Sequence, residues 1–204
     1  MPHTPQSSTT KLTELRRLCI HTITTKPWSL ADCVKNYSAK GIPAITVWRQ
    51  ALEPLGVKES ARLLKASGLR VTSICRGGFF PAEDSAGRQA AIADNKRAVD
   101  EAAAIGAPLI VLVCGAVPGI PLSDARKQIT DGIAAVLPYA QAAGVKLGIE
   151  PLPPMEADSR SAVNTTGQAT DMVEVINHSA GGIAVEVVHQ WWGSESGKGI
   201  SLRR

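Results

Sequence analysis

The sequence lacks any long apolar run, and this absence excludes a class of proteins. Its longest apolar stretch is the short segment PLIVLVCG at 108–115, whereas a helix that crosses a bilayer needs about 20 apolar residues. The first residues, MPHTPQSSTTKL, also lack the apolar segment of a secretory signal. We therefore expect no membrane partner, a cytoplasmic location, and a disordered polar tail over residues 1–12.

Cysteine is scarce and never paired closely in the sequence. The four cysteines, Cys19, Cys33, Cys75 and Cys114, form no C-x-x-C pair, and three of them lie in strongly apolar runs. This spacing argues against a disulfide framework and against a zinc knuckle. We expect reduced thiols that pack in the core, which agrees with a cytoplasmic location.

Charge is uneven along the chain, although its net value is only +4. Residues 1–76 hold twelve Lys and Arg against four Asp and Glu, and the rest of the chain holds ten against fourteen. A basic half can indicate nucleic acid or an anionic substrate, but its longest basic cluster is the pair Arg16 and Arg17. We interpret the excess as solvated helix faces, and nucleic acid is not expected as a partner.

What the sequence does contain is a repeating pattern of apolar strand, loop and amphipathic helix, about 30 residues long, as parallel β/α architecture requires. The apolar content of 44% and charged content of 20% are ordinary for a globular domain. The predicted strands are 18–23, 44–48, 69–75, 108–114, 145–150 and 183–188. The predicted helices are 30–39, with Ser29 as its N-cap, then 57–66, 86–105, 124–143, capped by Ser123, and 166–176.

The turn after the first predicted strand decides between two α/β folds. A doubly wound sheet usually has a glycine-rich turn after its first strand, but here that turn is TTKPWS. We therefore predict an α/β fold of the (β/α)8 TIM-barrel type. A closed barrel has eight units and about 250 residues, so this barrel is incomplete, with about six units over residues 13–192 and a polar C-terminal tail at 193–204. The open edges of the first and sixth strands predict a homodimer.

Two carboxylates follow or interrupt neighbouring predicted strands. Glu150 ends the fifth strand, and Glu186 lies within the apolar run IAVEVVH, close to His189. A buried carboxylate is costly unless it is paired or binds a metal. Oxygen ligands suit Mg²⁺ or Mn²⁺, and a nearby imidazole favours Mn²⁺. The alternative is that each carboxylate pairs with a local Arg or Lys.

The residues around these carboxylates resemble a known family. The segments GIEPLPPMEADSRSAVNT at 148–165 and AVEVVHQWW at 184–192 resemble the sugar phosphate isomerase/epimerase family, the xylose-isomerase-like TIM barrels. The earlier segments VWRQALEPLG and GLRVTSICRGGFF are similar to the same family. The resemblance covers residues 15–192 approximately.

The resemblance implies a divalent metal, Mn²⁺ or Mg²⁺, held by Glu, Asp, His and Glu from the ends of strands five to eight. Glu150 matches the first ligand, and Glu186 stands where the family has Asp. Glu150 would also take part in proton exchange through an ene-diolate, and His189 matches a family histidine that binds a substrate oxygen. The remaining His and Glu ligands come from strands seven and eight, which the chain does not contain, so we expect a C-terminally truncated barrel with doubtful activity.

The same resemblance implies a small-molecule carbohydrate substrate, namely a sugar, sugar phosphate or polyol. On the rim of the barrel, Lys26, Arg49 and Arg76 would hold hydroxyls or a phosphate. Trp48 and Phe79 would stack on a sugar face, with plain packing as the alternative for both aromatic residues. The expected function is thus a metal-dependent isomerase or epimerase. The alternatives are a non-catalytic barrel remnant, a lyase on oxidised sugars, and an abasic-site endonuclease.

Overall fold

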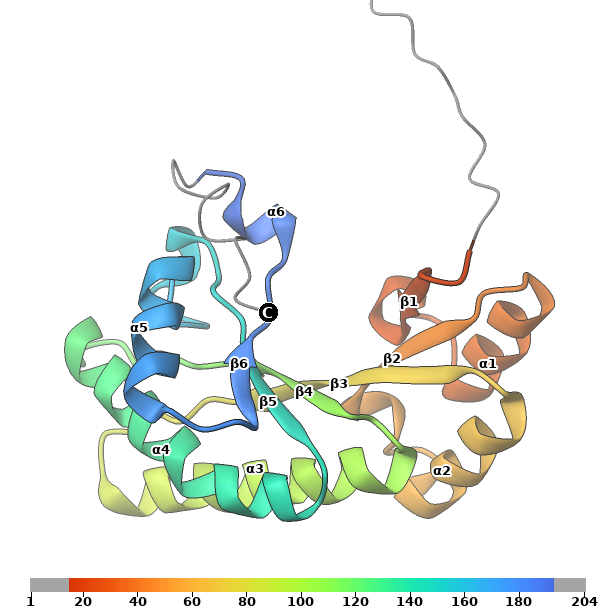
Figure 1. Cartoon of the computed structure of the whole chain (residues 1–204), viewed down its shortest axis with the longest axis horizontal. Coiled ribbons are helices and arrows are strands. Elements are labelled where there is room, and N and C mark those ends of the chain that lie inside the picture. The colour runs from red at the N-terminus through yellow and green to blue at the C-terminus, as the bar shows by residue number, and fades with distance from the viewer. Residues whose placement is uncertain (1–14, 193–204) are drawn as a thin grey trace, which may run out of the picture.

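The computed structural model describes residues 15–192 as one sheet of parallel strands with helices along its outer side (Figure 1). The strands are β1 (Cys19–His21), β2 (Ala44–Trp48), β3 (Arg70–Gly78), β4 (Leu109–Val113), β5 (Lys146–Ile149) and β6 (Gly181–Ile183). The helices are α1 (Leu30–Ala39), α2 (Gly56–Ser67), α3 (Ser85–Ile105), α4 (Leu122–Ala142), α5 (Thr166–Ile176) and α6 (Val187–Gln190). Three short 3₁₀ helices are η1 (Thr22–Thr25), η2 (Arg49–Ala51) and η3 (Pro154–Glu156).

The six strands lie in the order of the chain, from β1 to β6, and every neighbouring pair is parallel. This order and the alternation with helices confirm the prediction of an incomplete TIM barrel. Within residues 15–192, β1 and β6 are the two edges of the sheet, and each is only three residues long. The predicted tails at 1–12 and 193–204 lie outside the described residues, and the homodimer stays a prediction.

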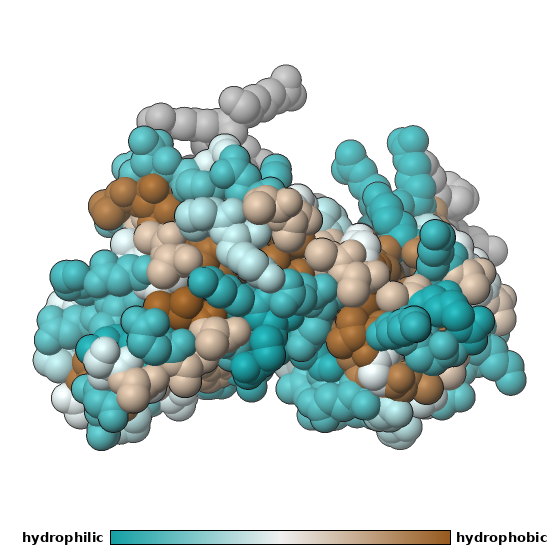
Figure 2. All heavy atoms as spheres, turned by 90° about the horizontal axis from the view of Figure 1, so that it is seen from below, coloured by the Kyte–Doolittle hydropathy of each residue, from teal (hydrophilic) through white to brown (hydrophobic). Residues whose placement is uncertain are grey.

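The helices cover the outer face of the sheet because the strands place apolar side chains on that face. Alternate strand residues such as Ile45, Val47, Ile74, Ile110 and Leu112 are fully buried against the helices. The outward sides of α2, α3 and α4 carry mainly hydrophilic side chains, with only scattered apolar ones (Figure 2). The fold thus leaves the inner face of the sheet and the carboxyl ends of its strands for a binding site.

Helix capping follows the predictions in part. Ser29 caps α1 as predicted, since its hydroxyl accepts a hydrogen bond from the Asp32 amide at 3.1 Å. The prediction for Ser123 is wrong, because α4 begins at Leu122, two residues earlier than predicted, and Pro121 takes the N-cap position. All four cysteines are free, and Cys33, Cys75 and Cys114 are buried, in agreement with reduced core thiols.

The sixth strand is the main correction to the predicted elements. It ends at Ile183, so Glu186 does not lie inside a strand but at the N-cap of α6, with its side chain half exposed. The reason is that β5 ends at Ile149, whose carbonyl accepts the last hydrogen bond of this pair from the Ala184 amide. Beyond this point the chain has no strand to pair with in the described sheet. None of the described helices is long and apolar enough to cross a membrane.

Candidate active site

The carboxyl ends of the strands open into a cleft of about 580 Å³ on the inner side of the sheet. Its wall is built by residues from β1, β2, β3 and β4, by the segment after β5 and by the segment after β6. Its ionisable side chains are those of His21, Cys75, Glu150, Arg160, Glu186 and His189. Ionisable side chains from several strand ends therefore line one cleft.

Three of these side chains form a compact cluster. One ligand atom each from Glu150, Glu186 and His189 can be chosen so that all three atoms lie within 4.8 Å of one another. The Nδ1 atom of His189 lies 3.3 Å from Glu186 Oε2 and 3.8 Å from Glu150 Oε1. The sequence thus predicted correctly which groups meet here, although it placed Glu186 on the wrong element.

Backbone contacts hold this cluster in place. The amide of Glu150 donates to the Leu112 carbonyl at 3.1 Å, which fixes Glu150 at the end of β5. The buried side chain of Gln190 donates through Nε2 to the Pro151 carbonyl at 3.0 Å. This bond ties α6 to the segment after β5, so that α6 presents His189 toward Glu150.

The electrostatics of the cluster favour a cation. Burial and the nearby Glu186 carboxylate raise the pKa of Glu150 to about 7, because a second negative charge is costly in a partly dry cleft. The Nδ1 atom of His189 is buried and makes no hydrogen bond to any described residue. Two carboxylates and an available imidazole nitrogen form a donor set that suits a divalent ion such as Mn²⁺ or Mg²⁺, and also Zn²⁺.

The opposite wall of the cleft carries groups from β1, β2 and β3. Trp48 lines the cleft, and its indole Nε1 is buried with no hydrogen-bond acceptor among the described residues. Burial lowers the pKa of His21, which keeps its imidazole neutral near pH 7, although Glu186 partly opposes this shift. Burial, with a smaller contribution from Glu150, raises the pKa of Cys75 to about 12, so this thiol stays protonated and is not a nucleophile.

Four of the predicted substrate-binding residues lie outside this cleft. Arg49, Arg76 and Phe79 line a separate hollow of about 470 Å³, and the Arg76 guanidinium lies 4.1 Å from the centre of the Phe79 ring. Lys26 is exposed at the end of η1 and lines neither cavity. Arg76 follows Cys75 on β3, and because Cys75 faces the cleft, the alternation of strand side chains turns Arg76 away from it. Arg49 instead begins η2 and pairs with carboxylates of α3.

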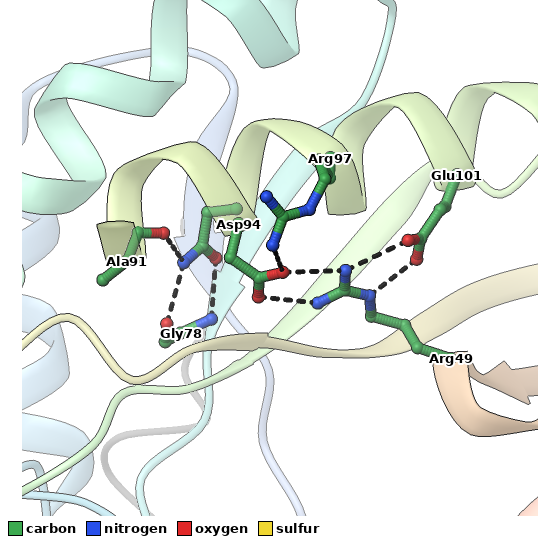
Figure 3. Close-up of polar contacts among 7 residues, drawn as sticks. Arg49, Gly78, Ala91, Asp94, Arg97 and Glu101 are labelled. Carbon is green, nitrogen blue, oxygen red and sulfur yellow. Dashed lines mark hydrogen bonds and ion pairs between the residues drawn. The ribbon is translucent and has the colours of Figure 1, made fainter. Parts of the chain in front are cut away.

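Arg49 belongs to an ion-pair network on the outer side of the sheet (Figure 3). Its guanidinium donates to Glu101 Oε2 at 2.6 Å and to Asp94 Oδ2 at 2.8 Å, and both carboxylates belong to α3. The bonds to Glu101 and then to Asp94 raise the pKa of Arg49, and the bond from Arg49 lowers the pKa of Asp94. This arginine therefore joins η2 to α3 and has no donor directed at the metal cluster.

Replacing Arg49 by lysine tests this assignment. We expect the free energy of unfolding to fall by about 2 kcal/mol, because lysine keeps the charge but cannot bind two carboxylates through a planar fork. Urea unfolding measures the change. The matched control is Arg62→Lys, whose exposed pair with Glu59 lies within α2 and should contribute less than about 1 kcal/mol. Equal losses in the two variants would contradict the structural role of Arg49.

Sequence reasoning missed Arg160, which lines the cleft together with Glu150. It lies in the segment between β5 and α5, where its carbonyl accepts a hydrogen bond from the Gly115 amide at 2.9 Å. The next residue, Ser161, pairs with Gly115 in an isolated parallel bridge. Because this pairing joins distant parts of the chain, no local pattern indicates that the segment folds back over the cleft.

Comparison with known proteins agrees with the fold. The family model described as xylose isomerase-like TIM barrel matches residues 34–200. A solved structure of protein SMc04130 from Sinorhizobium meliloti 1021 is 45% identical, with a TM-score of 0.87, and the match covers 91% of this chain and 68% of that protein. No curated protein sequence gives a match.

Two more distant structures share the fold. A D-psicose 3-epimerase, solved in the presence of D-fructose, is 17% identical with a TM-score of 0.75, and the match covers 87% of this chain and 66% of that one. The IolI protein, solved with a bound zinc atom, is 20% identical with a TM-score of 0.72, and the match covers 84% of this chain and 63% of the IolI chain. The chain therefore spans about two thirds of the length of these structures.

Proposed function

Because the chain belongs to the xylose isomerase-like TIM barrel family, we propose that it binds a divalent cation and acts in the isomerisation or epimerisation of a small carbohydrate. The observation that carries this proposal is the cluster of Glu150, Glu186 and His189 at the carboxyl ends of the strands. The substrate would be a sugar, a sugar phosphate or a polyol. The D-psicose 3-epimerase with the same fold supports this class of reaction.

The residues of the cleft fit a metal ion of the hard or borderline kind. Glu150 and Glu186 would hold it through carboxylate oxygens, with Mn²⁺ or Mg²⁺ as the expected ion, and the zinc atom bound in the IolI structure supports a metal in a protein of this fold. A bound divalent ion polarises a substrate carbonyl and so acidifies the neighbouring C–H group.

The side chains of the chain itself would supply proton transfer and orientation. Glu150 lines the cleft beside Glu186 and His189, and it would exchange the carbon-bound proton through an ene-diolate. His189 has a buried ring nitrogen available for a substrate oxygen. Trp48 lines the same cleft, and its buried indole N–H has no acceptor among the described residues, so it would donate to a substrate hydroxyl.

Calorimetric titration with Mn²⁺ and with Mg²⁺ tests the metal site. We expect binding at millimolar ion or tighter, and we expect the affinity to fall by about tenfold or more in Glu150→Gln and in Glu186→Gln, since each variant removes a charged ligand. The control Glu174→Gln removes an equal charge from the exposed side of α5 and should bind metal like the unaltered protein.

Two results would contradict the proposal. One is the absence of metal-dependent heat at millimolar ion, which would favour a non-catalytic barrel. The other is an affinity that is the same in all three variants, which would place the ion elsewhere.

A further inference from the structure

Arg160 is the only lysine or arginine among the described residues that line the cleft. The other charged lining residues are Glu150 and Glu186, which form the cluster already described. His21 is held neutral near pH 7 by burial. A divalent ion would balance the two carboxylates, which would leave the open ion pair with Glu156 as the partner of the Arg160 charge among the described residues.

Hydrogen bonds on both sides hold the backbone of Arg160 in place. Its amide donates to the Glu156 carbonyl at 3.0 Å, and its carbonyl accepts from Gly115 at 2.9 Å. The following residue, Ser161, is fully buried. The position of Arg160 at the cleft is therefore set by a local turn on one side and by a tertiary contact with Gly115 on the other.

The guanidinium itself has little to bind in the protein. The one ion pair that it forms with a described residue is with Glu156, in which Nη1 and Oε1 lie 3.5 Å apart. No hydrogen bond joins the guanidinium to any residue in the range 15–192, and Glu156 also accepts a bond from the Ser159 hydroxyl at 3.1 Å. An open ion pair of this length contributes little to stability. Most of the five N–H donors of Arg160 thus remain available to a ligand.

We propose that Arg160 binds an oxyanion on the substrate, either a carboxylate or a phosphate, so that the cleft selects an acidic or phosphorylated sugar over a neutral one. This inference rests on the proposed function, because it assigns the substrate class of the same site. The planar fork of arginine matches the oxygen atoms of a carboxylate or a phosphate in a two-bond arrangement. A neutral hydroxyl would use one donor and leave the charge unbalanced.

D-fructose and two of its derivatives, which differ from it only at carbon 6, test the proposal. Isothermal titration calorimetry of the Mg²⁺-saturated protein would compare D-fructose, D-fructuronate and D-fructose 6-phosphate. We expect at least one of the two anionic sugars to bind about tenfold or more tightly than D-fructose. The anionic sugar whose affinity exceeds that of D-fructose by the larger factor shows whether the substrate carries a carboxylate or a phosphate.

Variants of Arg160 connect the preference to this residue. In Arg160→Gln the preference for the anionic sugar should disappear while D-fructose binding changes little, and Arg160→Lys should keep part of it. The control Arg62→Gln removes the same charge from the exposed outer side of α2 and should keep the whole preference. The Mg²⁺ heat and the far-ultraviolet spectrum show that each variant is folded.

Two outcomes would overturn the inference. Either the unaltered protein binds both anionic sugars no more tightly than D-fructose, or Arg160→Gln weakens all three sugars by the same factor. If Mg²⁺ gives no binding heat, the proposed function fails. The sugar titrations are then repeated in EDTA, where the same two outcomes decide the role of Arg160 separately.

Discussion

Replacing Glu150 by glutamine should stabilise the metal-free protein at pH 8 by about 3 kcal/mol. In the folded protein, burial and Glu186 raise the pKa of Glu150 from 4.5 to about 7, and this difference is the free energy lost when the carboxylate ionises in the cleft. The penalty is fully present above pH 7 and disappears as the pH falls toward 4.5. Glutamine has no charge to bury, so it never incurs this penalty.

Urea unfolding in EDTA at a series of pH values measures this effect. The increase in the free energy of unfolding caused by Glu150→Gln should be largest at pH 8 and should fall below about 1 kcal/mol at pH 5. The control Glu174→Gln, on the exposed side of α5, should show no such pH dependence. A glutamine variant that is less stable than the unaltered protein at pH 8 would show that Glu150 is not strained by its surroundings.

With saturating Mg²⁺ or Mn²⁺, the unaltered protein should become more stable than Glu150→Gln. The unaltered protein gains stability because the ion binds only the folded state, whereas Glu150→Gln gains little. Such a reversal would identify Glu150 as a residue that lowers stability in order to bind a ligand.

Replacing Gly78 by alanine should reduce the free energy of unfolding by at least about 4 kcal/mol, an unusually large loss for one methyl group. Gly78 ends β3 with φ at 107°, a conformation that alanine rarely adopts, and a Cβ atom there would collide with the Val113 carbonyl oxygen of β4. The buried side chain of Asn95 also binds both the amide and the carbonyl of Gly78, at 2.7 and 2.8 Å (Figure 3). The strand end therefore cannot move away without breaking these bonds.

Gly106→Ala is the matched control for this substitution. Gly106 also has a positive φ, of 73°, at the end of α3, but a Cβ atom there would have no neighbour within 4 Å. The control should therefore lose only about 1 kcal/mol, which is the conformational cost alone. Thermal or urea unfolding compares the two variants. Similar losses in both would mean that β3 can shift away from β4 at little cost.

The sequence was most informative where local chemistry decides the structure. The apolar runs and the Ser29 cap correctly predicted α1, α5 and the order of the strands, because strand and helix patterns depend on neighbouring residues. Glu150 could be placed at the cleft for the same reason. Its position after an apolar strand in a parallel sheet leaves it at the edge where the site forms.

The errors arise where distant segments decide the structure. The run IAVEVVH has the β-branched composition of a strand, yet the sheet stops at Ile183 because β5 offers no further partner. Arg49 and Arg76 were predicted on the rim of the site, but they line a separate hollow, since strand alternation turns Arg76 away and Arg49 pairs with α3. Arg160 reaches the cleft only through the bridge between Gly115 and Ser161, which joins segments about 45 residues apart in the sequence.

The order of the strands also has a consequence for how the chain folds. Each strand of the described sheet pairs with the strand that follows it in the sequence, so every pairing closes a loop of one β/α unit. The entropy lost on closing a loop grows with its length, and the pairing of a first strand with a last one would close the longest loop of all. No such pairing is needed to build the sheet from β1 to β6. Assembly can therefore begin at an inner pair and spread outward through strands that are neighbours in the sequence, as in repeat proteins.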